Sequence, residues 1–260
     1  MMLPNCLFCS GGCSMLFTNR RSLKKQAILK LRYLRTRMGS RNEAYESCMR
    51  QEDECGYQGI RLSKHLKKEA ALALTTNLQV LVPKVLPLKE IFCYLVGSRR
   101  QKRNNTKVQK VEAVGVTLNM KAGIEHFCIH PGGRAIIDGI GKIFSLSEYD
   151  LEPSRMALFR FGNTSASGFW YALAYMEAKK RLKKGDRILM SGFGSGFKCN
   201  NAVWEVLRDL DDANVWKGCI DNYPAEKLKN GFMEKYDWMN DESIRFARID
   251  WYQLSTSIVI

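Results

Sequence analysis

Long apolar runs, histidine and proline are scarce in this sequence. Its 260 residues include three histidines and six prolines. A helix that crosses a bilayer needs about 18 or more consecutive apolar residues. The longest apolar run here, near Leu78–Leu88, is interrupted by Pro83 and Pro87. No secretory leader is visible. The sequence as given therefore predicts no membrane-spanning helix, and it predicts reduced thiols in a cytosol-facing protein.

Acidic residues are also few beside basic ones, at 26 against 41, which gives a formal net charge of +15. Two basic runs, Arg20–Arg37 and Arg99–Lys110, carry much of this charge. Such runs can bind nucleic acid, an anionic membrane surface or phosphorylated ligands. Neither run contains a recognisable nucleic-acid motif. A solvated basic surface or loop is therefore favoured, and no specific nucleic acid is predicted as a partner.

The nine cysteines do not form a metal-binding pattern. Cys6 and Cys9 make a CxxC, and Cys13 follows closely. A structural zinc site would need a second ligand pair at a suitable spacing. The HxxxH of His126 and His130 lies over a hundred residues away. The sequence therefore predicts no metal site, and it predicts no cofactor.

Hydrophobic content of 45% is typical of a folded protein, and the periodicity of the apolar residues predicts its first elements. Residues 13–17 read as a buried strand, and residues 28–37 as a strand with one wet face. Residues 40–61 are polar and predict a surface excursion. A helix is expected over 62–81, with Ser63 as its N-cap and with the following prolines closing it.

The second half has clearer boundaries between its elements. The expected elements are a strand over 125–130, a Pro-Gly-Gly turn, a helix over 134–143, a helix capped by Thr164 or Ser165 that runs through Met176, a strand over 187–190 and a glycine-rich loop over 192–197. Strands that alternate with helices indicate an α/β fold with a largely parallel or mixed sheet.

Two of the three histidines share one strand. His126 and His130 would point to the same face, about 13 Å apart at about 3.3 Å per residue, so they cannot both touch one reacting atom. Active sites of open α/β sheets gather at the carboxyl ends of strands. His130 is therefore the catalytic candidate, although a buried structural role stays open on position alone. His126 is the structural or supporting candidate, and His65 is expected on the surface.

Asn163 and the glycines of the loop are the other candidate site residues. Asn163 precedes a helix, where it can form an Asx-turn or cap, or donate as a neutral group to a developing oxyanion. Gly192, Gly194 and Gly196 lack the pattern of a P-loop or a dinucleotide fingerprint. They predict a backbone that passes close to a substrate or to the reacting residues.

These motifs together resemble the 3-ketoacyl-CoA synthases, the condensing enzymes of plant very-long-chain fatty-acid elongation. The segments that carry the resemblance include Leu3–Phe8 with Gly11–Gly12, Glu125–His130, Gly132–Arg134, Arg160–Ser165, Gly192–Cys199 and Ala202–Trp204. The resemblance implies a thiolase-like α/β fold with layers ordered α-β-α. It divides the chain into four parts, which are the remainder of an N-terminal half (1–96), a basic loop or linker (97–110), a C-terminal half (111–225) and a tail without a family match (226–260).

The resemblance also implies a Cys-His-Asn site in which His130 and Asn163 match the histidine and the asparagine. A cysteine accepts the acyl group of acyl-CoA, and decarboxylation of malonyl-CoA supplies the attacking carbanion. The implied partners are these two thioesters and a second subunit, either a copy of the chain or a homologue. The implied location is the cytosolic face of the endoplasmic reticulum membrane, with which the full-length family associates.

The chain departs from the family in two respects that bear on activity. The family's nucleophilic cysteine precedes the Leu-Pro-Asn-Cys-Leu-Phe segment near which this chain begins, so no cysteine here matches it. Histidines of the family are replaced by Arg32 and Arg37. We therefore expect an acyltransferase by descent that is inactive as this chain alone. The alternative is a non-catalytic remnant that binds an intact homologue, and a basic nucleic-acid-binding protein would rest on charge alone.

Overall fold

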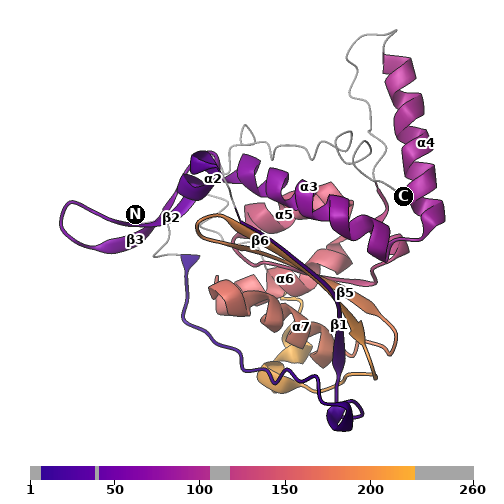
Figure 1. Ribbon diagram of the computed structural model, residues 1–260. Coiled ribbons are helices and arrows are strands. Elements are labelled where there is room, and N and C mark those ends of the chain that lie inside the picture. Colours follow the sequence, from indigo (N-terminus) through magenta and orange to yellow (C-terminus); the bar gives the residue numbers. More distant parts are fainter. Residues whose placement is uncertain (1–6, 39–40, 106–117, 226–260) are drawn as a thin grey trace.

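A mixed four-stranded sheet forms the centre of the protein, for which the computed structural model describes residues 7–38, 41–105 and 118–225 (Figure 1). Its strands, in order across the sheet, are β1 (Leu29–Met38), β6 (Lys198–Val206), β5 (Arg187–Gly194) and β4 (His126–Ile129). β4 runs parallel to β5, whereas β6 runs antiparallel to β5 and to β1. The mixed sheet that the sequence predicts is confirmed.

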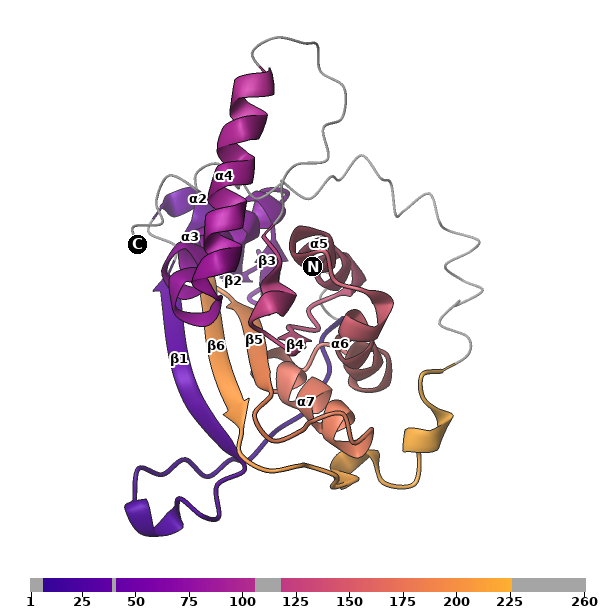
Figure 2. The same ribbon diagram turned by 90° about the vertical axis from the view of Figure 1, so that its right-hand side faces the viewer.

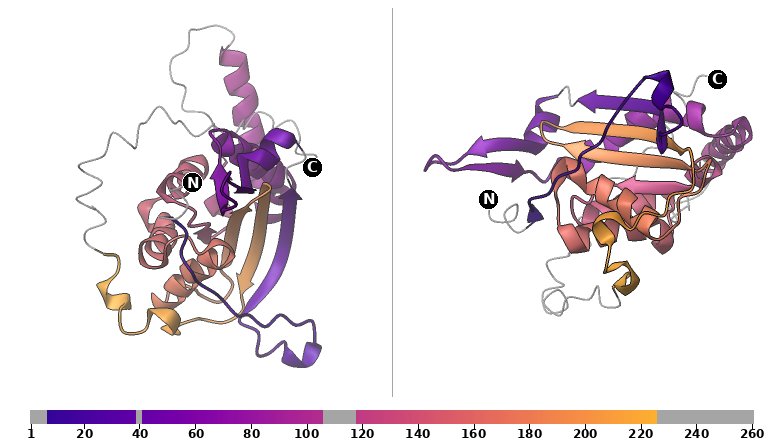
Figure 3. Two further views of the ribbon diagram at one scale, coloured as in Figure 1. Left: turned by 90° about the vertical axis from the view of Figure 1, so that its left-hand side faces the viewer. Right: turned by 90° about the horizontal axis from the view of Figure 1, so that it is seen from below.

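Helices lie on both sides of this sheet (Figures 2 and 3). They are α2 (Asn42–Ser47), α3 (Leu66–Val85), α4 (Leu88–Asn105), α5 (Arg134–Phe144), α6 (Glu148–Phe161) and α7 (Gly168–Ala178). Short 3-10 turns are η1 (Arg21–Leu23), η2 (Met120–Ala122), η3 (Ser165–Ser167), η4 (Asn214–Trp216) and η5 (Ile220–Asn222). None of the helices in the described ranges is both long enough and apolar enough to span a membrane.

Strand alternation explains why both faces of the sheet are covered. Side chains of successive residues point to opposite faces. In β4, Phe127 and Ile129 pack into a core with α3 and α5, whereas Cys128 packs into a second core with α7. Leu189 and Met190 of β5 divide between the same two cores. The result is the predicted α/β architecture with helical layers on either side of the sheet.

The polar excursion over 40–61 is confirmed as a separate surface feature. It contains α2 and a two-stranded antiparallel sheet of β2 (Cys48–Glu52) and β3 (Gln58–Leu62), which projects from the body of the molecule (Figure 1). The strand expected over 28–37 forms as β1, but the expectation of only one wet face is wrong, because residues 31–36 are exposed on both faces of the strand. The strand over 125–130 and the helix near 134–143 form as β4 and α5. The helix expected to run through Met176 forms as α7, but it begins at Gly168 with Ser167 at its N-cap, so the expected cap at Thr164 or Ser165 is wrong.

The buried strand expected over residues 13–17 is wrong. The segment lies outside any strand, and Leu16 and Phe17 are 87% and 64% exposed. A strand needs a neighbour with which to share its ladder of hydrogen bonds. No other strand of the described residues pairs with this segment. The described chain does not supply that neighbour, so the apolar pattern of this segment does not lead to a strand.

Both boundaries of α3 differ from the prediction. α3 begins at Leu66 after His65, and the Ser63 hydroxyl accepts a hydrogen bond from the His65 N–H instead of capping the helix. Pro83 lies inside α3 and does not end it. A proline removes one helical hydrogen bond, but Val82 and Val85 beside it are buried in the core. Packing of these neighbours outweighs the local preference.

The basic loop expected over 97–110 is wrong for residues 97–105, which continue α4. Arginine, lysine and glutamine are good helix formers. They can therefore continue a helix that starts in an apolar segment, even though they have no apolar periodicity of their own. Residues 106–110, the tail 226–260 and Cys6 of the CxxC lie outside the described residues.

The boundary expected near residue 96 does not separate two sheets. β1, from the first expected part, pairs along its length with β6 from the third. One core joins side chains of α3 to those of β4 and α5. The division into two related halves stays a prediction about how the chain is organised, while the described residues share one sheet.

Candidate active site

His130 directly follows β4 at the carboxyl end of the strand. Its backbone N–H donates to the carbonyl oxygen of Ser191 in β5, at 2.9 Å. The residue is 7% exposed, and its Nδ1 has no hydrogen-bond partner among the described residues. Burial lowers the pKa of His130 from 6.5 to about 4. The imidazole is therefore neutral near pH 7, a form in which one ring nitrogen can donate a hydrogen bond and the other can accept one.

Gly132 allows the turn after β4 to fold back against the His130 ring. A Cβ atom at this position would lie 2.7 Å from His130 Cδ2 and 2.9 Å from Nε2. Carbon atoms do not pack at such distances, so any side chain here would displace the imidazole. The Pro-Gly-Gly turn that the sequence shows is thus required by the position of the ring.

Asn163 lies where α6 ends, and it faces the same turn. Its Oδ1 accepts a hydrogen bond from the Ser165 N–H at 2.9 Å, which confirms the expected Asx-turn. Its Nδ2 donates to the Gly132 carbonyl oxygen over a long 3.4 Å. The amide oxygen is therefore occupied, and the amide protons point toward the turn that holds His130. Asn163 is 3% exposed, and its backbone pairs with Leu7 and Cys9.

His126 occupies the other end of β4 and has a partner of its own. Its Nε2 lies 2.8 Å from Asp186 Oδ2, and the same carboxylate accepts from the Lys183 N–H. This pair ties the start of β4 to the turn that precedes β5. The structure thus keeps His126 away from His130, and its contacts support the structural assignment.

The glycine-rich loop is a β-hairpin in the structure. Gly192 and Gly194 belong to β5, and the expectation of a loop is wrong for both. Gly196 is in the turn at φ 79°, a conformation that favours glycine. A Cβ on Gly192 would lie 3.2 Å from the Phe169 ring of α7. Gly192 therefore permits close packing of β5 on α7, and none of these contacts reaches His130.

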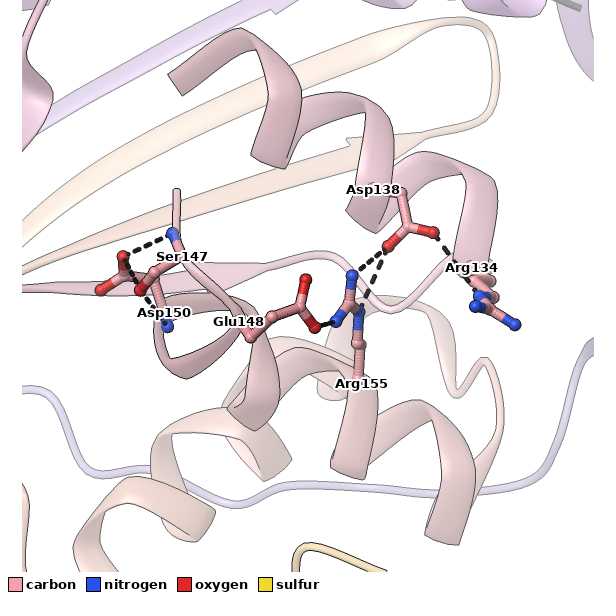
Figure 4. A network of polar contacts seen from close by, with 6 residues as sticks. All are labelled: Arg134, Asp138, Ser147, Glu148, Asp150 and Arg155. Atoms are coloured by element: carbon pink, nitrogen blue, oxygen red, sulfur yellow. Dashed lines mark hydrogen bonds and ion pairs between the residues drawn. The ribbon is translucent and has the colours of Figure 1, made fainter. Parts of the chain in front are cut away.

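A clamp of charged residues joins α5 to α6 and thereby holds both flanks of the site (Figure 4). α5 begins two residues after Gly132, and α6 ends two residues before Asn163. Arg155 of α6 donates to Asp138 of α5 at 2.7 Å and also pairs with Glu148. The clamp therefore fixes the distance between the two segments that carry His130 and Asn163.

The start of α6 is fixed separately by a capping box. Ser147 accepts from the Asp150 N–H, and the Asp150 carboxylate accepts from the Ser147 N–H and hydroxyl (Figure 4). Lys121 donates to the same carboxylate at 2.9 Å. A cap of this kind satisfies backbone N–H groups that the helix itself leaves unpaired. It sets where α6 starts and, through the length of the helix, where Asn163 lies.

Replacing Arg155 with methionine will lower the free energy of unfolding by about 2 kcal/mol, because the change leaves two carboxylates without their shared donor. Arg134 provides a matched control. It pairs with the same Asp138 at 3.5 Å but is 71% exposed at its side chain. Arg134→Met should therefore cost no more than about 0.5 kcal/mol. Urea denaturation of the two variants measures the difference, and equal losses would show that the clamp does not depend on Arg155.

A buried polar network behind the site is absent from the sequence prediction. Asn77 of α3 donates to Asn201 Oδ1 at 2.8 Å, and Asn201 of β6 donates to the Ser191 hydroxyl at 3.0 Å. Ser191 is also the residue whose carbonyl receives the His130 N–H. All three are at most 1% exposed. The sequence signal for it is an asparagine that stands between Cys199 and Val203 on the same face of its strand.

Cys128 and Cys199, the two fully buried cysteines of the described residues, are not poised as reactive thiolates. Cys128 is fully buried two residues before His130, and desolvation raises the pKa of its thiol far above the ordinary value. Desolvation likewise raises the pKa of Cys199 to about 12. A thiol becomes a nucleophile through its thiolate, which burial disfavours. Within the same residues no group of three or more potential ligands could hold a metal ion.

Comparison with known proteins identifies the family. A family model described as FAE1/Type III polyketide synthase-like protein matches residues 1–103. Another, described as 3-oxoacyl-[acyl-carrier-protein (ACP)] synthase III C terminal, matches residues 118–206. The chain is 54% identical to 3-ketoacyl-CoA synthase 19 of Arabidopsis thaliana over 252 residues, which cover 96% of this chain and 54% of that protein.

Two further relatives agree. 3-Ketoacyl-CoA synthases 12 and 3 of Arabidopsis thaliana are each 50% identical over 93% of this chain and 54% of their own length. The chain thus spans about half the length of the curated relatives it matches. The mixed α/β architecture and the match to the synthase III C-terminal model agree with a thiolase-like fold. On these grounds the chain belongs to the plant 3-ketoacyl-CoA synthase family, within the thiolase-like superfamily.

Proposed function

We propose that this chain carries the histidine and asparagine of a decarboxylative condensing site that acts on malonyl-CoA and a long-chain acyl group in very-long-chain fatty-acid elongation. The observation that carries the proposal is the pairing of a buried, neutral His130 with Asn163 around Gly132. The catalytic roles of both residues are part of the proposal. So are the thioester substrates, a dimeric assembly and association with the endoplasmic reticulum membrane.

The chemistry needs neutral hydrogen-bond donors. When malonyl-CoA loses CO2, the electron pair of the broken carbon–carbon bond moves onto the thioester, and its carbonyl oxygen becomes an enolate. N–H groups of His130 and Asn163 would stabilise that negative charge without transferring a proton. Because burial keeps His130 neutral at pH 7, the enolate is not quenched by an acidic imidazolium. The carbanion carbon then attacks an acyl thioester, and the thiolate leaves.

The acyl-bearing cysteine is not assigned within this chain. Cys128 and Cys199 are buried with raised thiol pKa values, and the resemblance matches no cysteine of the sequence to the nucleophile. Cys9 is exposed and lies next to Asn163 through its backbone, so it is the thiol that most needs a control. We propose that the chain alone decarboxylates malonyl-CoA but does not form a 3-ketoacyl product.

The test incubates the purified chain with carbon-14-labelled malonyl-CoA and a long-chain acyl-CoA. We expect slow release of CO2 with formation of acetyl-CoA, no labelled 3-ketoacyl product, and the same result for Cys9→Ser. A 3-ketoacyl product that disappears in His130→Ala would show that the chain holds its own nucleophile. If His130→Ala and the unmodified chain release CO2 at the same rate, the proposed site is wrong.

A second candidate function is that of a non-catalytic partner of an intact homologue. It is favoured by β1, an edge strand whose Leu31 and Leu34 are 42% and 60% exposed, and by exposed Leu16 and Phe17 nearby. Unpaired strand edges and apolar side chains are surfaces on which another chain can pair. This function would be supported if the chain co-elutes with an intact 3-ketoacyl-CoA synthase while contributing no decarboxylation of its own.

A further inference from the structure

The free edge of β4 is closed by a serine of α6. β4 is the outermost strand of the sheet, with β5 as its neighbour among the described residues. N–H groups of successive residues in a strand point to opposite sides, and the His130 N–H points to β5. The N–H of Ile129 therefore points outward, and it donates to the Ser154 hydroxyl at 2.9 Å. Ser154 and Ile129 are at most 1% exposed, so water does not take the place of this bond.

Ser154 uses its hydroxyl differently from Thr75 of α3. Thr75 donates to the carbonyl oxygen of Ala71, four residues earlier in the same helix. A bond of that kind is local and connects a helix only to itself. Ser154 accepts from a different element, the strand that leads to the candidate histidine. An alanine at this position would leave the Ile129 N–H buried without an acceptor, a state that folded proteins rarely contain.

This bond joins the two segments that carry the candidate pair. Ile129 directly precedes His130, whose own N–H donates to the Ser191 carbonyl oxygen at 2.9 Å on the other side of the strand. The backbone that presents the imidazole is thus held from both sides. α6 continues from Ser154 and ends two residues before Asn163. Because a helix is stiff over two turns, the place where Ser154 meets β4 sets where α6 delivers Asn163.

Ser154 and its neighbour Arg155 tie α6 to different elements. Arg155 reaches α5 near the surface, where its side chain is 18% exposed. Ser154 is fully buried and reaches the sheet. We infer that Ser154 is a positioning residue, whose hydroxyl holds the His130 imidazole and the Asn163 amide at a fixed separation. It acts through the backbone of β4 and not on the substrate, and the inference rests on the proposed function for the role of that pair.

The test compares Ser154→Ala with Ser47→Ala, a buried serine of α2 whose hydroxyl donates to the Ala44 carbonyl oxygen outside the candidate site. NMR on the full chain measures amide hydrogen exchange and the ring signals of His130, which His130→Gln assigns. We expect Ser154→Ala to shift those ring signals and to speed exchange of the Ile129 and His130 amides by about tenfold or more. Ser47→Ala should leave both unchanged. Ser154→Cys keeps a weak acceptor and should fall between.

Decarboxylation of malonyl-CoA gives a second measurement. A small displacement of a reacting group lowers the rate strongly, so Ser154→Ala should reduce kcat by about tenfold to a hundredfold. KM should change by less than about threefold, because the hydroxyl contacts no substrate in the proposed site. A loss that came only from unfolding would lower kcat in proportion to the folded fraction, in Ser47→Ala as in Ser154→Ala.

The outcomes separate this inference from the proposed function. Unchanged ring signals and amide exchange in folded Ser154→Ala overturn the inference, whatever the decarboxylation assay shows. Changes of the same size in Ser47→Ala also overturn it, because they would reflect a general loss of stability. Changes confined to position 154 support it even if the unmodified chain releases no CO2, in which case only the proposed function falls. Should Ser154→Ala not fold, Ser154→Cys decides the outcome by the same measurements.

Discussion

Replacing His130 with alanine is expected, on the proposed function, to lower the rate of malonyl-CoA decarboxylation by about 10²–10³-fold. In the proposed site the change removes one of two donors that would face the developing enolate oxygen, in buried surroundings where electrostatic interactions are strongest. Asn163→Ala should cause a loss of similar size, because its amide protons point toward the same turn. Initial rates of acetyl-CoA formation, measured by chromatography at saturating malonyl-CoA, give both values.

The matched control for this prediction lies on the same strand. His126→Gln alters a histidine that pairs with Asp186 at the far end of β4. It should change the decarboxylation rate by less than about threefold once the folded fraction is corrected for. If His126→Gln reduces the rate as much as His130→Ala, then the catalytic assignment along this strand is wrong. Thermal unfolding by circular dichroism shows whether each variant is folded.

Acidification from pH 6.5 to pH 4 will destabilise the chain by about 3 kcal/mol through His130 alone. Burial lowers the folded-state pKa of this histidine from 6.5 to about 4. Below pH 6.5 the unfolded chain binds a proton that the folded chain does not, so unfolding becomes more favourable as the pH falls. The loss stops growing near pH 4, where the folded state also takes up the proton.

His130→Gln tests this assignment, because glutamine does not titrate. The variant starts from a lower stability, but its urea midpoint should change much less between pH 7 and pH 4. Parallel pH profiles for the variant and the unmodified chain would contradict the prediction.

The carboxyl group of Asp150 affects stability in a separate pH range. Burial raises its carboxyl pKa, but hydrogen bonds from Lys121 and Ser147 outweigh burial and lower it below the usual 3.8. Its contribution is therefore lost only at a pH below that of the His130 effect.

The order of the local elements around the site could be predicted from residues close together in the sequence. The strand before His130 follows from a short apolar run, the turn from Pro-Gly-Gly, and the next helix from apolar residues at helical spacing. The preference for His130 over His126 follows from strand geometry and from the position at the carboxyl end. The structure adds a physical reason for each, since Gly132 packs on one ring and Asp186 binds the other.

The errors arose where distant contacts outweigh local preference. Pro83 stays inside α3 because its neighbours are buried, and the apolar segment 13–17 is exposed because the described chain provides no adjacent strand. The glycine-rich segment reads as a loop, yet Gly192 and Gly194 extend β5 because β6 supplies partners for them. Pairing of this kind depends on where the next segment folds back, which local composition does not encode.

The sequence by itself determined the family, the α/β class and the identity of His130 and Asn163 as candidates, because short motifs and apolar periods depend on near neighbours. Only the tertiary structure decided that these two side chains meet at Gly132, since Asn163 is 31 positions further along the chain, and α5 and α6 must return the chain to the turn. It also decided that His130 is neutral, because burial is the sum of contacts from several elements.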